Sequence, residues 1–377
     1  MVRHRVTGLR TKPAGRITLT SLAANHPIDV APDTISETPM NPTRRHLLSA
    51  AGALATGSLV SPSQAQSTPL VKVATFVPEQ SVGVAKVIKP WMLATQQEVG
   101  TRARFQGFWG GSLGKDAFKQ FDLVRTGVAD VAWVLPGYHG RQFEDMQLFE
   151  LPFLFENATE AALVGWHLCE KKMLRGIEDV HLVGFFATEV SNLWMANPIK
   201  SLDELKGKKI RSVGAVHAEW LKVMGASAET MDSPEMNEGL QRRTLDGVIQ
   251  SWSGMRTFKT LPLVRQNQLA PIGVIPFLLL MNRKTFDGLP KDVQDAVMKH
   301  GGTTLARGAG EAYEGVGQEI RATVEKDAKI QLAELAASDK ARYAQQAQAV
   351  HKWWIQKSPN GEKIYAEAVA QLKKIRG

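Results

Sequence analysis

Cysteine is almost absent from this chain of 377 residues, which has a single thiol, at Cys169. One cysteine cannot form an internal disulfide, so the fold has to rest on a hydrophobic core, and a chain of this length can bury one. The residues around it, GWHLCEKK, have a helical pattern. We therefore interpret Cys169 as a buried, inert thiol rather than a nucleophile.

The chain also lacks a block of like charge. Its net charge is +9, of which residues 1–65 contribute +4 through seven basic and three acidic side chains. The remaining +5 is spread along the rest of the chain. With 44% hydrophobic and 22% charged residues, the composition is that of a soluble globular protein, and a nucleic-acid partner is not expected.

Catalytic and metal-binding motifs are missing as well. The chain has no GxSxG, HExxH, CxxC or P-loop pattern. The glycine-containing stretch GAGEAYEG at 308–315 does not follow a strand, so we do not interpret it as a nucleotide site. Six histidines follow residue 65, and none has metal-ligand spacing to another: His139, His167, His181, His217, His300 and His351. We expect no enzyme activity, no cofactor and no metal.

Residues 41–67 have the three parts of an export signal. Arg44-Arg45 form a charged head, residues 47–60 are an uncharged apolar run, and Ser63-Gln64-Ala65 place small residues where a signal peptidase reads. The run is too short to cross a bilayer, which takes about 20 residues. We predict a twin-arginine-like signal at 41–65 and a periplasmic protein, with a surface helix as the alternative. We expect 1–40 to be a disordered leader or to precede the true start at Met40.

After this signal, the predicted elements alternate between strand and helix. Such alternation favours an α/β fold with mainly parallel strands. The predicted strands are 70–77, 103–109, 129–136, 179–187, 208–213, 245–251 and 276–282. The predicted helices are 81–100, 116–128, 215–225, 233–244, 290–328 and 361–375. We expect Ser233 to cap the helix at 233–244, and Gly301-Gly302 to bend the long one.

Three segments together resemble a known family. They are 108–155, 201–252 and 277–297, and within them the patterns LKGKKIR, LQ…LDG and MN…LP…VQ occur in order. They are similar to the DctP-type solute-binding proteins of tripartite ATP-independent periplasmic (TRAP) transporters. The likeness covers nearly all of 70–375 and rests on the order and separation of the patterns.

The resemblance implies a two-lobed periplasmic-binding-protein-like fold, type II-like, with crossing hinge strands and a long helix that spans both lobes. The ligand would lie between the lobes, and a hinge motion would close them. By this likeness, lobe 1 would hold 66–190 and 276–310. Lobe 2 would hold 191–275 and 311–377 with the C-terminal helices.

The same resemblance implies that Arg211, which ends the KGKKIR strand, pairs with the ligand carboxylate. A guanidinium suits this role because its planar fork of donors matches a carboxylate at two points. A lysine supplies charge without that geometry. We therefore interpret Lys206, Lys208 and Lys209 as a solvated run and Arg211 as the exception, with a surface arginine as the alternative.

Further candidates for the cleft carry over from the family pattern less directly. They are Gln250 and Trp252 after the LDG motif, Trp133 at the end of its strand, Phe76 after the first strand, and Ser233. Trp133 and Phe76 fit the core as well as the cleft, and capping already explains Ser233. The aromatic side chains would wall a pocket around one charge and disfavour a second carboxylate.

We therefore predict a receptor of a TRAP transporter that captures an organic acid anion, with an aromatic or branched monocarboxylate as the expected ligand. Its partners would be that anion and a small and a large integral membrane subunit. A sensor that reports to a membrane signalling protein is the alternative. An exported enzyme on the same scaffold would need a nucleophile or an acid–base pair, which the sequence does not supply.

Overall fold

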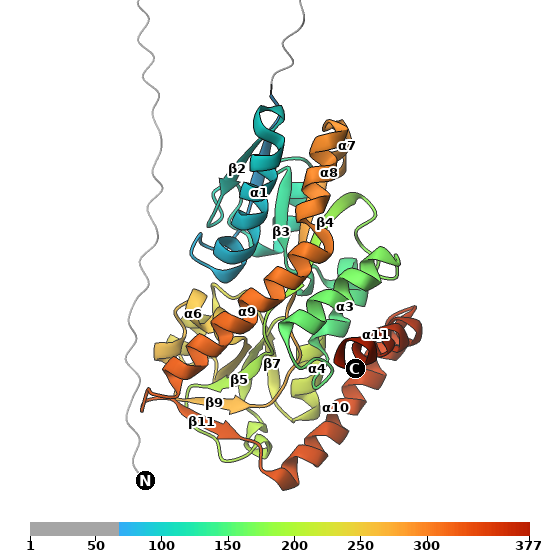
Figure 1. Ribbon diagram of the computed structural model, residues 1–377. Helices are drawn as coiled ribbons and strands as arrows, with labels where there is room; N and C mark the ends of the chain where they lie inside the picture. The colour runs from blue at the N-terminus through green and yellow to red at the C-terminus, as the bar shows by residue number, and fades with distance from the viewer. Residues whose placement is uncertain (1–67) are drawn as a thin grey trace, which may run out of the picture. The chain divides into compact units, whose positions relative to one another are not determined.

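The computed structural model describes residues 68–377, which form an α/β unit with two mixed sheets (Figure 1). The predicted leader at 1–40 and signal at 41–65 lie outside the described residues. Among the helices of residues 68–377, none combines the length and the apolar character that crossing a bilayer requires. The α/β class predicted from the alternation of elements is confirmed.

The first sheet has five strands in the order β2-β1-β3-β10-β4. Only β10 runs against the others, antiparallel to both of its neighbours. All seven residues of β10 are buried, because elements cover both faces of the sheet, and its sequence PFLLLMN is accordingly almost entirely apolar. The strands are β1 Leu70–Ala74, β2 Arg104–Phe108, β3 Val131–Val134, β4 Val180–Ala187 and β10 Pro276–Asn282.

The second sheet has six strands in the order β11-β9-β5-β8-β6-β7. Here β5 is the strand that runs against the rest. The strands are β5 Asn192–Met195, β6 Lys209–Ser212, β7 Ser227–Thr230, β8 Gly247–Gln250, β9 Gln266–Leu269 and β11 Gln331–Glu334. The prediction missed β5, β7, β9 and β11. The sequences of β7, β9 and β11 are SAET, QNQL and QLAE, which have no apolar run, and the NLWM of β5 shows no alternation.

The chain passes from the first sheet to the second after β4, and it returns before β10. The two connections are hydrogen-bonded to each other. The amide of Thr188 donates to the carbonyl of Ile275 over 3.0 Å, and that of Ser191 donates to Gly273 over 2.8 Å. We call these connections the hinge segments, residues 188–191 and 270–275.

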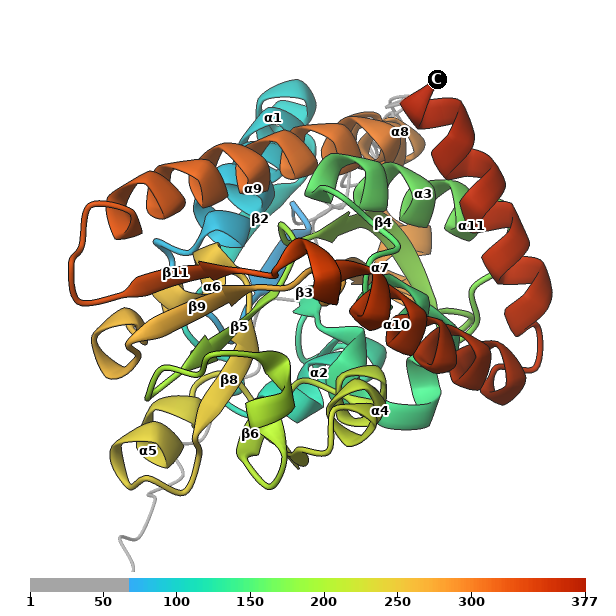
Figure 2. The same ribbon diagram turned by 90° about the horizontal axis from the view of Figure 1, so that it is seen from below.

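A long helix links the surroundings of the two sheets. It is α9, Gly302–Val324, and it follows α8, Lys291–His300. Figures 1 and 2 show α9 in orange running from α8 beside the first sheet toward β11 in the second. The predicted break at Gly301-Gly302 is confirmed, because Gly302 has φ +54°, a conformation that favours glycine.

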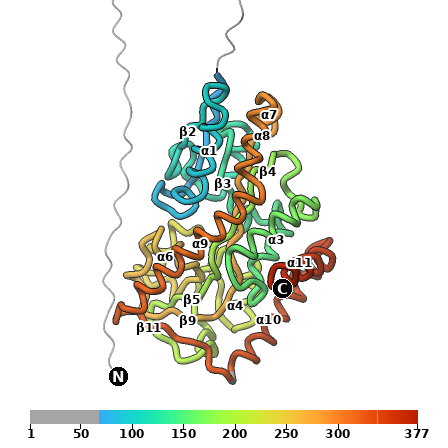
Figure 3. The backbone as a smooth tube through the Cα atoms, viewed as in Figure 1, coloured from blue at the N-terminus to red at the C-terminus, as the bar shows by residue number. Residues whose placement is uncertain are grey.

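The remaining helices cover the sheets, as the backbone trace in Figure 3 shows. The first predicted helix divides into a π-helical turn, η1 Gly83–Ile88, and α1 Lys89–Val99. The others of five or more residues are α2 Gln120–Arg125, η4 Pro136–Glu150, α3 Ala158–Glu170, α4 Ala215–Val223, α5 Met236–Gln241, α6 Trp252–Thr257, α7 Arg283–Gly288, α10 Ala337–Lys357 and α11 Gly361–Arg376. Of the C-terminal helices, α10 packs on α4 and α11 packs on α3.

The predicted cap at Ser233 is wrong. Helix α5 begins at Met236, three residues later than expected. In the turn that precedes it, the carboxylate of Asp232 accepts the amide hydrogen bond of Glu235 over 3.0 Å. The hydroxyl of Ser233 is therefore free of capping and bonds elsewhere.

Candidate functional site

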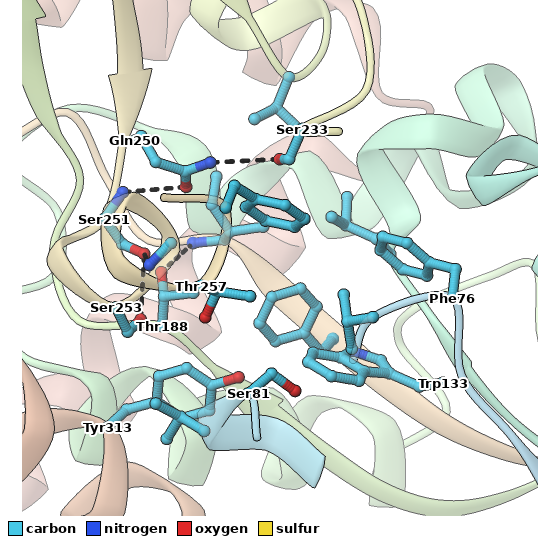
Figure 4. A pocket seen from close by; sticks show the side chains of 18 residues that line it. Phe76, Ser81, Trp133, Thr188, Ser233, Gln250, Ser251, Ser253, Thr257 and Tyr313 are labelled. Atoms are coloured by element: carbon cyan, nitrogen blue, oxygen red, sulfur yellow. Dashed lines mark hydrogen bonds between the residues drawn. The ribbon is translucent and has the colours of Figure 1, made fainter. Parts of the chain in front are cut away.

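A cavity of about 40 Å³ lies between the two sheets, and the hinge segments contribute Thr188 and Ile275 to its wall (Figure 4). It receives side chains from β3 and β10 of the first sheet, from β8 of the second, and from the start of α6. Four of the predicted site residues line it: Phe76, Trp133, Ser233 and Gln250. None of its lining residues carries a charged side chain; the others are Val77, Ser81, Val82, Leu135, Thr188, Val213, Ser251, Ser253, Gly254, Thr257, Phe258, Ile275, Phe277 and Tyr313.

Arg211 lies behind this lining, with its side chain fully buried. Strand β6 positions it, and four hydrogen bonds hold the guanidinium. Nε donates to the carbonyl of Met231 over 3.1 Å and Nη1 to that of Ile249 over 3.2 Å. Nη2 donates to Tyr138 Oη and Ser233 Oγ, both over 3.1 Å. Because Ser233 lines the cavity, this hydrogen bond puts the guanidinium in contact with a residue of the cavity wall.

Within residues 68–377, no carboxylate accepts a hydrogen bond from the guanidinium of Arg211. All four of its hydrogen-bond acceptors are neutral oxygens. A buried charge without a counter-ion is costly, so an anion that reached the guanidinium would be strongly stabilised. The arrangement is that of an anion-binding site.

The neighbouring lysines differ from Arg211 as the sequence predicts. Lys206 and Lys209 are exposed and Lys208 is half-buried, whereas Arg211 is fully buried on the inward side of the same strand region. The alternative that Arg211 is a surface arginine is therefore wrong.

A polar network joins the two sheets at Arg211. Tyr138, which follows β3 of the first sheet, accepts a hydrogen bond from the amide of Ser233 over 2.8 Å. Gln250, the last residue of β8, donates from Nε2 to Ser233 Oγ over 3.2 Å. Figure 4 shows this last contact at the cavity wall. Ser233 thus contacts the arginine, the tyrosine and the glutamine at once.

Sequence reasoning missed Tyr138. The tyrosine lies in LPGYHG, directly after an apolar strand, and nothing in that stretch marks it as polar and inward-facing. It lies 73 positions from Arg211 and 95 from Ser233. Its one available signal was its place at the end of a strand whose last residues were already expected to face the cleft.

Aromatic rings form the apolar side of the cavity. Trp133 packs edge-to-face on Phe277 with ring centroids 4.8 Å apart, and Phe76 lies 6.2 Å from Trp133. A Cβ at Gly83 would lie 2.3 Å from the indole, so this position needs glycine for the ring to fit. Phe76 and Trp133 are therefore part of a packed aromatic cluster and of the cavity wall together.

Hydroxyl groups line the opposite side, where α6 begins. The side chain of Ser251 caps this helix through Gly254, and Ser253 Oγ donates to the carboxylate of Glu189 over 2.9 Å. Burial raises the pKa of Glu189 to about 7, against the pull of its hydrogen bonds from Ser253. Because Glu189 belongs to a hinge segment, the start of α6 is tied to the hinge.

Trp252 is placed differently from the other candidates. Its ring packs edge-to-face on Trp194 at 4.8 Å and does not line the first cavity. It lines a second, larger cavity of about 780 Å³ together with Glu189, Glu314 and Arg321. Five of the six predicted residues thus lie together: four line the first cavity, and Arg211 contacts one of them, Ser233. The sixth, Trp252, lines the second cavity instead.

A metal-binding arrangement is not found within residues 68–377, where no group of three or more His, Cys, Asp or Glu side chains could hold an ion. Around the first cavity lie aromatic walls, several hydroxyls and, behind the lining, one buried cation. These groups suit an organic anion in kind, but about 40 Å³ is far below the roughly 300–1,000 Å³ of a ligand pocket, so the site has to open before such an anion can enter.

Comparison with known proteins gives a family. The sequence model of bacterial extracellular solute-binding protein family 7, DctP, matches residues 73–357. A curated relative is the C4-dicarboxylate-binding periplasmic protein DctP of Rhodobacter capsulatus. It is 26% identical over 235 residues, which are 61% of this chain and 68% of the relative.

Two solved structures share the fold. One is a TRAP solute-binding protein from a marine metagenome, specific for aromatic acid ligands, in complex with metahydroxyphenylacetate. Its TM-score is 0.77 at 22% identity, over 81% of this chain and 99% of that one. The other, from Rhodoferax ferrireducens, holds copurified benzoate, with a TM-score of 0.77 at 23% identity, over 81% and 98%. At these identities the likeness establishes the two-lobed fold.

Proposed function

This chain belongs to bacterial extracellular solute-binding protein family 7, the receptors of TRAP transporters, and on that premise we propose that its own solute is an aromatic or branched monocarboxylate bound through Arg211. The single observation that carries the proposal is a fully buried guanidinium without an ion-pair partner in the described residues, in contact with the wall of a cavity between the sheets.

The composition of the cavity wall supports a monocarboxylate. A second carboxylate would need a second cation or several free donors to offset its desolvation, and no lining residue is charged. Phe76, Trp133 and Phe277 offer aromatic faces for a ring or branched chain. The two structural neighbours hold aromatic acids, whereas the curated relative is named for C4-dicarboxylates. A dicarboxylate is therefore the alternative ligand class.

In this proposal, the ligand carboxylate bonds Arg211, Ser233 and Gln250, and the rings of Phe76 and Trp133 enclose the rest. Within the described residues Nη1 donates one hydrogen bond, to Ile249, so its second N–H is available to the ligand. Trp252 acts on the site through its neighbours on α6 and not by contact.

The two-sheet arrangement suits a closing motion around the bound anion, followed by delivery of the anion to the membrane. We propose that lobe 1 (66–190 and 276–310) and lobe 2 (191–275 and 311–377) rotate about the hinge segments and enclose the anion. The closed form would then present it to a small and a large membrane subunit. Export would use the twin-arginine-like signal at 41–65.

A thermal-shift panel tests the proposal. The purified protein is heated with benzoate, 3-hydroxybenzoate, a branched monocarboxylate and succinate, beside the variants Arg211→Ala and Lys209→Ala. A ligand at 100 times its dissociation constant stabilises by about 2.7 kcal/mol, which is a shift of a few degrees. Lys209 is the matched control, because it is an exposed cation two residues away on the same strand.

We expect a monocarboxylate to shift the parent and Lys209→Ala but not Arg211→Ala. Truncating one partner of a buried charged pair costs about 2–5 kcal/mol, a loss of roughly 30- to 5,000-fold in affinity. Stabilisation by succinate alone would refute the ligand class and leave the receptor in place. An equal response of parent and Arg211→Ala would refute the role of the arginine.

A further inference from the structure

Glu150 is a fully buried carboxyl group that the anion site described above does not use. It is the last residue of η4, and neither of its side-chain oxygens has a hydrogen-bond partner within residues 68–377. Unpartnered buried carboxyl groups are rare because they lose hydration without compensation. This one therefore calls for an explanation.

Two glycines, Gly137 and Gly273, make room for Glu150, and Gly214 lies beside it. A Cβ at Gly137 would lie 2.9 Å from its Oε1, whereas one at Gly214 would lie 3.5 Å from its Oε2, an ordinary van der Waals contact. A Cβ at Gly273, in a hinge segment, would lie 2.4 Å from its backbone carbonyl carbon. The carboxyl group thus lies between the loop after β3 and the start of α4. Val213, which lines the cavity, approaches Gly137 from the same side.

The ionisable groups around Glu150 come from three places. Arg211 on β6 attracts its negative form, and His217 in the first turn of α4 is also fully buried. The charge of Arg211 also acts on Asp232 and on Tyr138, where it favours the ionised forms. The hinge segment 270–275 contributes no ionisable side chain.

Burial decides the charges of Glu150 and His217. It raises the pKa of Glu150 to about 8, and the attraction of Arg211 only partly opposes this. Burial, with repulsion from Arg211, lowers the pKa of His217 to about 3, although the nearby backbone of Ile272 favours the charged form. At pH 7 both groups are neutral, so Arg211 is the charge that an entering anion meets.

We propose that Glu150 competes with the ligand carboxylate for the positive charge of Arg211, so that this protein takes up its anion together with a proton held on Glu150. The inference rests on the proposed anion site at Arg211. Glu150 acts through Arg211 and does not touch the ligand, so it is a positioning residue. Its carboxyl group stays protonated while the ligand occupies the arginine.

The direction of the linkage follows from charge. In the free protein, Arg211 helps Glu150 to ionise. Once a ligand carboxylate neutralises Arg211, Glu150 loses that help and holds its proton to higher pH. Affinity is therefore constant up to about pH 8 and then falls with rising pH, by up to about tenfold per pH unit. Above pH 8, each binding event takes up as much as one proton.

Titration calorimetry of the full chain tests this. The probe is benzoate or succinate, whichever stabilises the protein in the panel above, because neither titrates between pH 7 and pH 9.5, where the affinity is expected to fall. Binding is measured from pH 6 to pH 9.5, and at pH 8.5 in two buffers of different ionisation enthalpy, which reveals proton uptake. The variant Glu150→Gln keeps the shape and removes the titration. Glu219→Gln is the control, because Glu219 on α4 is a half-buried carboxylate whose ion-pair partner is the exposed Lys222.

We expect parent and Glu219→Gln to bind more weakly at pH 9.5 than at pH 7, by up to about thirtyfold, with proton uptake at pH 8.5. Glu150→Gln should bind like the parent at pH 7 and lose most of the fall and of the proton uptake. Parent binding that is independent of pH, or a fall that persists in Glu150→Gln, overturns this inference and leaves the anion site standing. Failure of both probes to bind at any pH overturns the anion site and this inference with it.

Discussion

Replacing Glu150 by glutamine is expected to stabilise the folded protein at neutral pH, without any ligand. The reason is the difference between its folded and unfolded states. In the unfolded chain the carboxyl group is hydrated and has an ordinary pKa, about 4.3 for glutamate. In the folded protein, burial raises the pKa to about 8. The folded state therefore binds a proton that the unfolded state has already lost.

The sign and size follow from linkage. Below about pH 4.3 both states are protonated, and Glu150 does not change the free energy of unfolding. Between about pH 4.3 and pH 8 the stability falls by about 1.4 kcal/mol per pH unit, because only the unfolded state is ionised. At pH 7 the accumulated cost is roughly 3–4 kcal/mol. Above pH 8 the cost is constant.

Unfolding in urea measures this contribution of Glu150 to the free energy of unfolding. Parent, Glu150→Gln and Glu219→Gln are unfolded at pH 5 and pH 7.5, and the free energies of unfolding are compared. The gap between Glu150→Gln and the parent should grow by roughly 3 kcal/mol from the lower to the higher pH, and the control should track the parent. A gap that does not change with pH would mean that Glu150 titrates normally, and the reasoning on its burial would be wrong.

Three other predictions follow from single contacts. Tyr138→Phe leaves the amide of Ser233 without its acceptor and should lower the free energy of unfolding, measured in urea, by about 1–3 kcal/mol. An unchanged unfolding midpoint would contradict this prediction. Gly254→Ala places a Cβ 2.4 Å from Gln250 Oε1 and should displace the glutamine side chain from Ser233. The affinity for the ligand anion, measured by calorimetry, should then fall by about 2- to 10-fold. An unaltered affinity would speak against a role for the contact between Gln250 and Ser233. Burial raises the pKa of the Cys169 thiol, so iodoacetamide at pH 8 should label it only after unfolding, and rapid labelling of the native protein would show it to be accessible.

Local pattern predicted the elements that are long or strongly apolar. The runs at 179–187 and 276–282 became β4 and β10, because strands buried on both faces need apolar residues throughout. The break at Gly301-Gly302 was visible because a positive φ favours glycine. Helix α10, Ala337–Lys357, was missed: its alanine- and glutamine-rich sequence has a weak apolar face, and packing on α4 defines its place.

From the sequence alone, Arg211 is already set apart from the lysines beside it, because the resemblance implies a carboxylate-binding arginine at this position. The groups that surround Arg211 become visible only in the folded chain. Tyr138 and Glu150 both belong to η4, but they lie 73 and 61 positions before Arg211, and Ser233 lies 95 positions after Tyr138, so no local period brings these residues to the arginine. Whether Ser233 capped a helix or bonded a guanidinium, and whether Glu150 kept its charge, depended on which groups the fold left without water. Burial is a property of the packed chain, so the protonation and partners of this site could be read only once the sheets were in place.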